Sequence, residues 1–409
     1  MSLFNYQINL NSQSFSKKKK NIIILIRRSP GELDWIMPLL YSIRKNYNIF
    51  TIFRSSKIIN LIRKEKILFS LWNKTSFGYT VEPKLKAIVF RIGYFLFKKT
   101  ILGNYFKHKF QDNFYNISKI EKLIQINTNT VSSFIPVAIF AEFINFSPWI
   151  NFFYNQNKSI KIIHFPHTTN LLGEKKIKIK IKKKIKNKFL LLSNSYDAKS
   201  FLNRFSKSNI IEAGYLKYEK SWVKKFLIKK KKKSKKIIYI SYQGFVAKKM
   251  HLQKYIQQTK DVMDVCTSIS GLQILIKTHP MTDKKELLKI LNNYPQKKWK
   301  LVNYSQTYLA NICDVYLSMW ESASILDALS SNKTPIELWS ILKKTKGIKE
   351  SRFQKLKVTL FVQNKIELKN QITKLLKKKF YKQFKIQQRF NKNFFINGSI
   401  AYTKKIIGL

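Results

Sequence analysis

Short apolar runs alternate with longer segments of helical periodicity along most of the chain. Apolar runs of roughly four to eight residues, bounded by turn residues, are typical of strands that a parallel sheet buries on both faces. In the first half, such runs predict strands at residues 21–26, 48–53, 122–127, 160–165 and 188–193. Residues 34–46 have helical spacing between the first two strands. The pattern therefore indicates repeated strand–helix–strand units.

The alternation restarts after a run of five lysines at residues 229–233. Strands are then predicted at residues 236–242, 273–278, 300–304, 315–319 and 334–339, and the clearest helix at residues 251–265. We predict two doubly wound, Rossmann-like α/β domains that face each other across a cleft. In such folds ligands bind where strands end and helices begin.

Length and composition are consistent with two cores, because 409 residues exceed one ordinary core and 44% of them are hydrophobic. The predicted parts are an N-terminal domain at residues 1–225, a basic linker at 226–234, a C-terminal domain at 235–365 and a helical tail at 366–409. The two cysteines, Cys266 and Cys313, have apolar neighbours in sequence, which predicts reduced core thiols in a cytoplasmic protein.

Two segments raise the question of a membrane span. Residues 21–26 are too short, two arginines follow them, and no small-residue cleavage site appears, so they indicate neither a span nor a signal peptide. Residues 87–103 are the most membrane-like segment, but charges interrupt them. We interpret this segment as an amphipathic helix or a core helix.

The net charge of +58 suggests nucleic-acid binding at first sight. Only nine of the 79 basic residues are Arg, however, and Arg carries most bidentate recognition of phosphates and bases. Lys, Asn, Ile, Phe and Tyr are abundant together, as AT-rich codons favour, so we interpret much of the charge as codon bias. Lys-rich surfaces can still bind anionic lipid at roughly 1 kcal/mol per residue. Residues 173–188, where Ile alternates with Lys, are a two-faced strand, a basic loop or such a lipid-docking segment.

Polar residues follow the predicted strand at 315–319 in the order that an anion site requires. Ser318 ends the strand, and residues 322–331 are predicted as the next helix, whose first turn offers unpaired N–H groups and a positive dipole end. Ser322 and Ser324 add hydroxyl donors, and Glu321 could accept hydrogen bonds from a ribose or sugar hydroxyl. The plainer interpretation is that Ser322 caps the helix and Glu321 complements its dipole.

A second strand of the same domain ends in Lys277 and His279, and Pro280 stops it. A cation and an imidazole at the carboxyl end of a strand suit a diphosphate, although a single His there is often structural. Because a second anion-binding element is predicted in the same domain, we expect both residues to contact the ligand.

In the first domain, Arg27 and Arg28 follow the first strand and could bind an anionic acceptor. Glu32 and Asp34 then lie at the start of a helix, where carboxylates complement the dipole. Glu32 is equally a candidate general base, and Asp34 is a weaker candidate for acceptor contact.

His167 follows a proline at the tip of another strand of this domain, where an imidazole is suited to take a proton near neutral pH. His164 lies inside the apolar run and is predicted to be a core residue. No phosphate loop, no G-x-G-x-x-G after the first strand and no Cys/His cluster of metal spacing occur, which argues against nucleoside triphosphatases and dinucleotide dehydrogenases. We expect no metal and no cofactor.

Six segments occur in the order of a known family: "PHTTN" (166–170), "LLSNSYDAKSFL" (191–202), "EAGYLKYEKSW" (212–222), "ILIKTHP" (274–280), "DVYLSMWESASILDALSSNKTPIEL" (314–338) and "NGSIAYTKKI" (397–406). Together they resemble the GT-B glycosyltransferases of bacterial surface polysaccharide synthesis. The likeness is greatest to the branch with CDP-glycerol glycerophosphotransferases and capsule polysaccharide transferases. Order and spacing carry the resemblance, because each motif is short.

The resemblance implies that His167 lies near the acceptor as a candidate base, that His279 meets the donor diphosphate, and that Ser322 and Ser324 bind phosphate. The expected protein is a cytoplasmic, membrane-peripheral and metal-independent GT-B glycosyltransferase. Its donor would be a nucleotide sugar, and its acceptor a surface glycan or a lipid-linked molecule at an anionic membrane surface. No specific nucleic-acid partner is expected.

Three alternatives stay open. A glycerophosphotransferase would use the same site with CDP-glycerol, and a sugar-nucleotide 2-epimerase shares the architecture but needs several carboxylates in the cleft. A non-enzymatic, Lys-rich protein that binds membranes or nucleic acids is the third alternative; its nucleic-acid binding would weaken steeply with salt.

Overall fold

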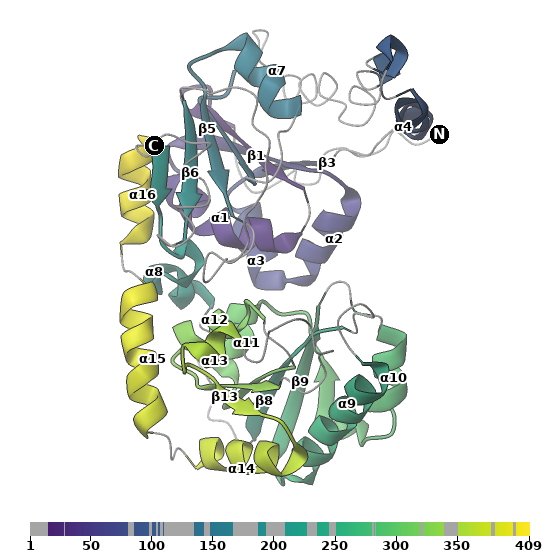
Figure 1. The fold of residues 1–409 in the computed structure, drawn as a ribbon. Coiled ribbons are helices and arrows are strands. Elements are labelled where there is room, and N and C mark those ends of the chain that lie inside the picture. Colours follow the sequence, from purple (N-terminus) through teal and green to yellow (C-terminus); the bar gives the residue numbers. More distant parts are fainter. Residues whose placement is uncertain are drawn as a thin grey trace. The chain divides into compact units, whose positions relative to one another are not determined.

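The computed structural model describes residues 15–27, 29–80, 86–97, 100–103, 105, 106, 109, 135–142, 148–166, 187–193, 209–226, 235–244, 251–279, 282, 284–319, 322–338, 351–377, 381–395 and 398–409. The chain divides into two compact units (Figure 1). Unit 1 comprises Met1–Lys217 and Gly398–Leu409, and unit 2 comprises Tyr218–Asn397. The end of the predicted helical tail thus returns to the first unit.

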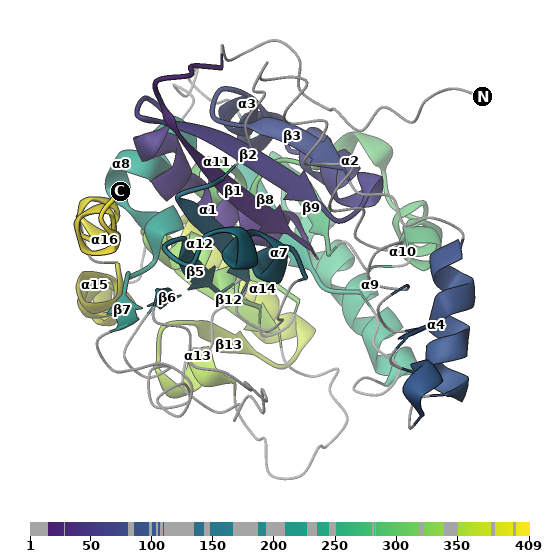
Figure 2. The same ribbon diagram turned by 90° about the horizontal axis from the view of Figure 1, so that it is seen from above.

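Unit 1 contains a seven-stranded sheet. Its strands are β1 (Lys20–Ile26), β2 (Tyr47–Phe53), β3 (Phe77–Thr80), β4 (Ala138–Glu142), β5 (Lys161–Phe165), β6 (Lys188–Leu192) and β7 (Ile210–Glu212). The order is β3-β2-β1-β4-β5-β6-β7, and all neighbours are parallel. Figure 2 shows β1, β2 and β3 side by side. The strand order reverses between β1 and β4, where doubly wound folds place their ligands.

In the described part of unit 1 the helices are α1 (Pro30–Ile43), α2 (Ser56–Lys64), α3 (Lys66–Asn73), α4 (Lys86–Leu96), α7 (Pro148–Gln156) and α16 (Ser399–Ile407). The short helix η3 (Leu216–Tyr218) spans the point where the chain passes into unit 2. Buried residues of β1, β2, β4 and β5 pack with α7 into one core, as continuous apolar strands require. α1 begins with a proline at its first position, which has no N–H to leave unpaired.

Unit 2 contains a six-stranded parallel sheet. Its strands are β8 (Lys236–Tyr242), β9 (Leu272–Thr278), β10 (Trp299–Leu301), β11 (Val315–Ser318), β12 (Pro335–Leu338) and β13 (Leu360–Val362). The order is β10-β9-β8-β11-β12-β13, so the reversal lies between β8 and β11. The helices are α8 (Lys220–Val223), η4 (Lys224–Phe226), α9 (Leu252–Ser268), α10 (Lys284–Leu291), η5 (Gln296–Lys298), α11 (Gln306–Ile312), α12 (Ile325–Ser330), α13 (Arg352–Lys355), α14 (Lys365–Leu376) and α15 (Tyr381–Phe394).

Helices cover both faces of the unit 2 sheet. One core joins the strands to α9, α10 and α14, and a smaller core on the opposite face contains residues of α11 and α12. The alternation along β8 decides this division, because Ile238 and Ile240 belong to the first core and Tyr239 belongs to the second. The prediction of two doubly wound α/β sheets is confirmed.

The last helix, α16, packs in unit 1 beside α1 (Figure 1). Lys161 on β5 donates from Nζ to the Ile407 carbonyl at 2.8 Å, which satisfies one of the free carbonyls at the end of the helix. Gly214 lies next to the start of α16, with a φ of +69°, and a Cβ there would stand 2.6 Å from Ser399 Oγ. Gly214 of the "EAGY" segment and Ser399 of the "NGSIAY" segment therefore meet in this unit.

Most predicted strands are confirmed within a residue or two, and the helix predicted at 251–265 is α9. Among the strands that the structure describes, β3, β4, β7 and β13 were not predicted, and each has five residues or fewer. The helix predicted at 34–46 begins earlier, at Pro30, and the helix predicted from Ser322 begins later, at Ile325. The strand predicted at 122–127 lies outside the described residues.

Candidate functional site

One row of residues crosses the carboxyl edge of the unit 2 sheet. Lys277 on β9 pairs in register with Ser241 on β8, and Ser241 pairs with Ser318 on β11. Residues in register share a face, so these three side chains lie on the same side of the sheet. Two residues earlier on that side, Tyr239 and Tyr316 make an edge-on ring contact in the core that includes α11 and α12. The row therefore lies at the reversal of strand order.

Three serines are joined by hydrogen bonds beside this row. The hydroxyl oxygens of Ser241 and Ser324 are 2.8 Å apart, and Ser324 Oγ donates to Ser322 Oγ at 2.9 Å. The Tyr316 hydroxyl donates to the Ser324 carbonyl at 2.8 Å, which fixes the turn before α12. We call Ser241, Ser318, Ser322 and Ser324 the serine cluster.

The predicted residues Ser318, Ser322 and Ser324 thus gather in one place. Sequence reasoning missed Ser241. The available signal was a polar residue near the carboxyl end of an otherwise apolar strand. Within the cluster, Ser241, Ser318 and Ser324 are buried, whereas Ser322 is half-buried and its neighbour Ala323 is exposed. Ser322 is therefore the most accessible member, and Ser324, itself bonded to Ser241, orients it.

The start of α12 differs from the prediction. The N–H groups of Ile325, Leu326 and Asp327 donate to the carbonyls three residues earlier, so a tight turn precedes the helix. The hydroxyl of Ser324, the residue before α12, is used toward Ser241 and Ser322, and it makes no cap bond to the helix. The first N–H groups of this six-residue helix are therefore already paired, and the hydroxyls are the distinctive donors here.

Lys277 and His279 both lie at the end of β9. Lys277 Nζ donates to the Tyr304 carbonyl at 2.6 Å, so its ammonium group is held toward the segment after β10. The backbone N–H of His279 donates to the Tyr242 carbonyl at 2.9 Å and extends the pairing of β8 and β9. The His279 side chain is exposed, but partial desolvation by neighbouring atoms lowers its pKa below 6.5. Its imidazole is therefore mostly neutral at pH 7 and offers one N–H donor.

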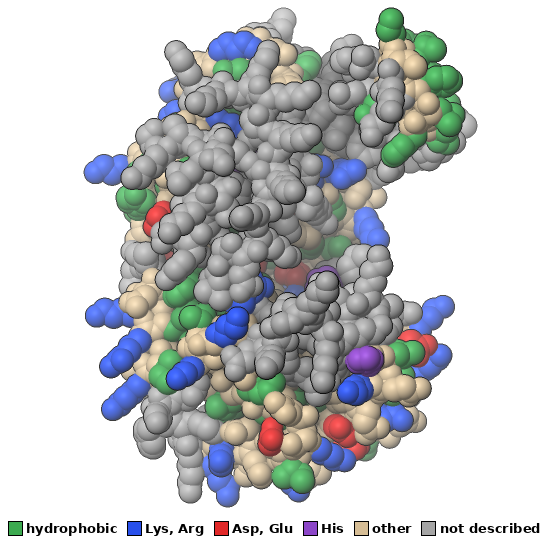
Figure 3. All heavy atoms as spheres, in the orientation of Figure 1, with side chains coloured by type: hydrophobic (Ala, Val, Ile, Leu, Met, Phe, Trp, Pro, Cys, Tyr) green, Lys and Arg blue, Asp and Glu red, His purple; other side chains and the backbone are tan. Residues whose placement is uncertain are grey.

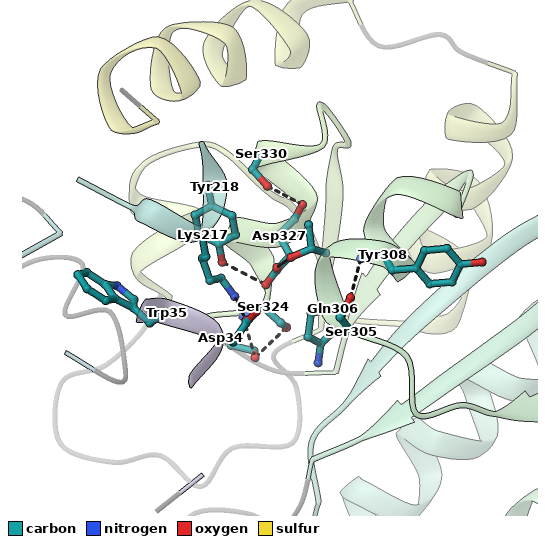
Figure 4. Close-up of polar contacts among 12 residues, drawn as sticks. Asp34, Trp35, Lys217, Tyr218, Ser305, Gln306, Tyr308, Ser324, Asp327 and Ser330 are labelled. Atoms are coloured by element: carbon teal, nitrogen blue, oxygen red, sulfur yellow. Dashed lines mark hydrogen bonds and ion pairs between the residues drawn. The ribbon is translucent and has the colours of Figure 1, made fainter. Parts of the chain in front are cut away.

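A buried carboxylate ties α12 to α11 and to the first residue of unit 2 (Figure 4). Asp327 Oδ1 accepts from Thr307 Oγ1 at 2.7 Å, and Oδ2 accepts from the Tyr218 hydroxyl at 3.1 Å. The Ser330 hydroxyl donates to the Asp327 carbonyl at 3.0 Å. Sequence reasoning gave Asp327 no role, because Tyr218 lies 109 positions away in the chain. This network holds the helix that follows the turn with Ser322 and Ser324.

In unit 1, Glu32 stabilises the turn between β1 and α1. Its side chain is fully buried, and Oε2 accepts a hydrogen bond from the backbone N–H of Arg27 at 2.8 Å. The Glu32 N–H donates to the Ser29 carbonyl at 3.2 Å. This placement favours a structural carboxylate, and the role of Glu32 as a general base stays a prediction. Arg27 is half-buried beside it.

Asp34 forms an ion pair inside unit 1. Its Oδ2 accepts from Lys217 Nζ at 3.0 Å, with both side chains mostly buried. Lys217 belongs to the "GYLK" segment that ends the first pass through the unit. The next residue, Trp35, donates from Nε1 to Ser193 Oγ at 3.3 Å and stacks on Phe165 with ring centroids 5.9 Å apart. The start of α1 is therefore fixed against the ends of β5 and β6.

Three predicted site residues, Arg28, His167 and Glu321, lie outside the described residues. His164 is buried on β5, as predicted for a core residue. Burial, and then the positive charge of Lys188, lower the pKa of His164 to about 3. Glu142, at the carboxyl end of β4, is a buried carboxylate that sequence reasoning missed because it missed the strand.

Two further observations concern only the part of the chain that the structure describes. No three His, Cys, Asp or Glu side chains there are grouped as ligands for a metal ion. None of the described helices combines the length and the apolar character needed to cross a membrane.

The fold is similar to that of several solved enzymes. The UDP-GlcNAc 2-epimerase of Neisseria meningitidis, bound to UDP-GlcNAc, matches with a TM-score of 0.56 and 10% identity over 94% of this chain and 98% of its own. The UDP-GlcNAc 2-epimerase of Methanocaldococcus jannaschii, in complex with UDP-GlcNAc and UDP, matches with a TM-score of 0.54 and 14% identity over 95% and 99%. A glycotransferase of kitacinnamycin matches with a TM-score of 0.53 and 9% identity over 96% and 99%.

By sequence, no known family model and no curated protein matches the chain. Identities of this size in the structural matches show a shared fold alone. The two parallel sheets and the nearly complete coverage show that the chain has the GT-B fold.

Proposed function

We propose that the protein is a glycosyltransferase that moves a sugar from a nucleotide-sugar donor to a surface glycan or a lipid-linked acceptor. The observation that carries the proposal is the serine cluster at the reversal point of the unit 2 sheet, whose Ser241 is in register with Lys277. Hydroxyl donors at this position of a doubly wound fold suit the phosphates of a nucleotide.

In this proposal unit 2 binds the donor. Ser322 donates a hydrogen bond to a phosphate oxygen, and the buried Ser241 and Ser324 keep its hydroxyl oriented. His279 donates one imidazole N–H to the diphosphate, a donor that the neutral form favoured by its lowered pKa still has. Lys277 exchanges the Tyr304 carbonyl for a phosphate oxygen and stabilises the charge of the leaving nucleotide.

Unit 1 would bind the acceptor. His167 is the proposed base that deprotonates the acceptor hydroxyl, with Glu32 as the alternative. Arg27, Arg28 and Asp34 are proposed to contact the acceptor, in which case Asp34 would have to give up its ion pair with Lys217. Capsule or another surface polysaccharide is the proposed product.

Nucleotide binding tests the donor half of the proposal. Titration calorimetry with UDP, dTDP, GDP and CDP should give a measurable affinity for at least one of them. His279→Ala should weaken that affinity at least tenfold, or about 1.4 kcal/mol, and Ser322→Ala about three- to tenfold through the loss of one hydrogen bond.

The chain offers matched controls for both variants. Ser330→Ala removes a hydroxyl from the other end of α12, and His251→Ala removes an exposed histidine before α9. Both should bind the nucleotide within about twofold of the parent protein. Unchanged binding in His279→Ala and Ser322→Ala would refute the proposed donor site.

Incubation with nucleotide sugars and CDP-glycerol then separates the enzyme classes. Release of a nucleoside diphosphate that depends on an added acceptor supports the glycosyltransferase. Release of CMP from CDP-glycerol identifies the glycerophosphotransferase. Conversion of UDP-GlcNAc without acceptor-dependent nucleotide release identifies an epimerase-like enzyme, for which Glu142 and Glu32 are the described buried carboxylates at the carboxyl edge of unit 1.

A further inference from the structure

A group of large apolar side chains on α4 and the residues after it is exposed in the described part of the chain. Val89, Ile92, Phe95 and Leu96 are 55–73% exposed, and Ile101 and Leu102 are 90% and 54% exposed. We call these six residues the α4 patch. Figure 3 shows green side chains gathered on this segment at the upper right. Contiguous apolar surface of this kind marks an interaction site more often than chance exposure does.

The exposed residues form one stripe of the helix. Val89, Ile92 and Leu96 follow the spacing i, i+3, i+7, which brings them to one side of α4. An 11-residue helix is about 16 Å long, roughly half the thickness of a bilayer's hydrocarbon core. The helix can therefore lie along a membrane surface but cannot cross it.

The other side of α4 already has a partner within the same segment. The Phe106 ring lies 6.4 Å from the Phe90 ring and stacks on the Phe97 ring at 5.6 Å, centroid to centroid. Gly93 leaves room for it, because a Cβ at that position would stand 2.6 Å from the Phe106 ring. Phe106 thus covers Gly93 and part of Phe90, although Phe97 keeps 39% of its surface exposed, and the α4 patch lies beside this contact.

Charge indicates what covers the α4 patch. Residues 83–110 contain seven Lys or Arg residues and no Asp or Glu, within a chain of net charge +58. A second copy would bring the same positive charges together, whereas an anionic bilayer attracts them. Counting Phe97 and Tyr105, which are 39% and 53% exposed, eight large apolar side chains of residues 89–105 are exposed, and five of them are aliphatic. Most of this surface therefore cannot stack on nucleic-acid bases, because such stacking uses aromatic side chains. An apolar stripe flanked by basic residues is the composition of helices that lie in the membrane interface.

We propose that the α4 patch docks the protein on an anionic lipid bilayer, with α4 in the plane of the membrane and the apolar stripe among the acyl chains. This site differs from the Ile/Lys segment at residues 173–188, which lies outside the described residues. The inference goes beyond the proposed function and does not need it, although a membrane-bound enzyme would meet a lipid-linked acceptor there.

Co-sedimentation of the full chain with vesicles tests the proposal, using equimolar phosphatidylglycerol and phosphatidylcholine, and phosphatidylcholine alone. Binding to the anionic vesicles should be at least tenfold stronger than to the neutral ones. Ile92→Ser/Leu96→Ser should weaken binding to the anionic vesicles at least tenfold. The matched control is Leu252→Ser/Ile366→Ser, which changes side chains of unit 2 that are 49% and 74% exposed, and it should bind within twofold of the parent protein.

A second measurement reports on insertion itself. Both native cysteines are buried, so Leu96→Cys can be labelled selectively with an environment-sensitive fluorophore. Its emission should shift to the blue when anionic vesicles are added, and the same label at Ile366→Cys should not respond.

Three results would overturn the proposal: equal binding by both double variants, equal binding to both kinds of vesicle, or no blue shift at position 96. A chain that dimerises in solution through residues 92 and 96 without binding vesicles would show that a second copy covers the patch instead. Nucleotide binding is measured without lipid, so failure of the docking surface and failure of the proposed donor site are distinguishable.

Discussion

At the scale of single residues, burial decides what each polar group can do. Ser322 is the accessible member of the serine cluster, whereas Ser241, Ser318 and Ser324 are buried. Ser324 contacts Ser322 directly and is itself bonded to Ser241. Glu32 shows the opposite case, because its carboxylate is fully buried and accepts a backbone N–H. Burial therefore leaves one hydroxyl of the serine cluster accessible in unit 2 and commits the Glu32 carboxylate to a turn in unit 1.

His164 makes a prediction about acid stability. Burial, with the positive charge of Lys188, lowers its pKa from 6.5 to about 3, so the unfolded chain binds the proton more tightly than the folded one. The contribution of the neutral His164 to the free energy of unfolding is fully present above pH 6.5. It should be lost as the pH drops toward 3, by up to about 1.4 kcal/mol per pH unit. Between pH 7 and pH 5, His164→Gln should lose about 2 kcal/mol less stability than the parent protein in urea unfolding.

The control for this experiment is His251→Gln, which changes an exposed histidine. It should keep the parent protein's loss of stability in acid, because it leaves the buried imidazole of His164 in place. Identical slopes for His164→Gln and the parent protein would show that the buried imidazole does not cause the loss of stability in acid.

At the scale of elements, the apolar pattern predicts most strands, because a strand buried on both faces must be apolar throughout. It misses β4 and β7, of five and three residues, but finds β10 and β11, which are equally short. An apolar run of this length separates a strand from a loop unreliably. The pattern also cannot give the register that aligns Lys277, Ser241 and Ser318, which depends on pairing between distant segments.

The candidate site was predictable to a similar extent. Lys277, Ser318 and Ser322 stand at strand and helix ends in the sequence, where ligand contacts of such folds concentrate. Ser241 and Asp327 could not be assigned, because their roles come from contacts 83 and 109 positions away in the chain. The early turn before α12 was missed for the same reason, since the Ser324 hydroxyl bonds to β8 and does not cap the helix.

Gly214 makes a prediction at the element scale, because it joins the end of the first pass through unit 1 to α16. Its φ of +69° disfavours any side chain, and a Cβ would stand 2.6 Å from Ser399 Oγ. Gly271 has the same φ, but a Cβ there would meet nothing within 4 Å. Gly271→Ala should cost about 1–2 kcal/mol from the backbone alone, and Gly214→Ala about 1–3 kcal/mol more.

Denaturant unfolding of the two variants measures this difference. Adding Ser399→Ala to Gly214→Ala removes the hydroxyl nearest the new Cβ, so it should recover part of the lost stability. Equal losses at positions 214 and 271 would show that α16 adjusts to a side chain at Gly214 without cost.

At the scale of the whole molecule, net charge is the dominant electrostatic feature. The 21 acidic residues cannot neutralise 79 basic ones even if every carboxylate is paired, so 58 positive charges repel one another in the folded chain. Added salt screens this repulsion, since the Debye length falls from about 30 Å at 0.01 M to about 8 Å at 0.15 M ionic strength. The unfolded chain spreads the same charges over a larger volume and gains less from screening.

Raising NaCl from about 0.01 to 0.15 M should therefore stabilise the protein by about 1 kcal/mol, seen as an increase in Tm of about 2–4 °C. Sodium and potassium chloride at equal ionic strength should act alike, because screening does not depend on the identity of the cation. A Tm that falls with salt would mean that attractive ion pairs, such as Asp34 with Lys217, outweigh the repulsion. A measurement of DNA affinity over the same salt range separates the proposed enzyme from a nucleic-acid-binding protein. The affinity of a nucleic-acid-binding protein for DNA would drop steeply with salt and would survive His279→Ala.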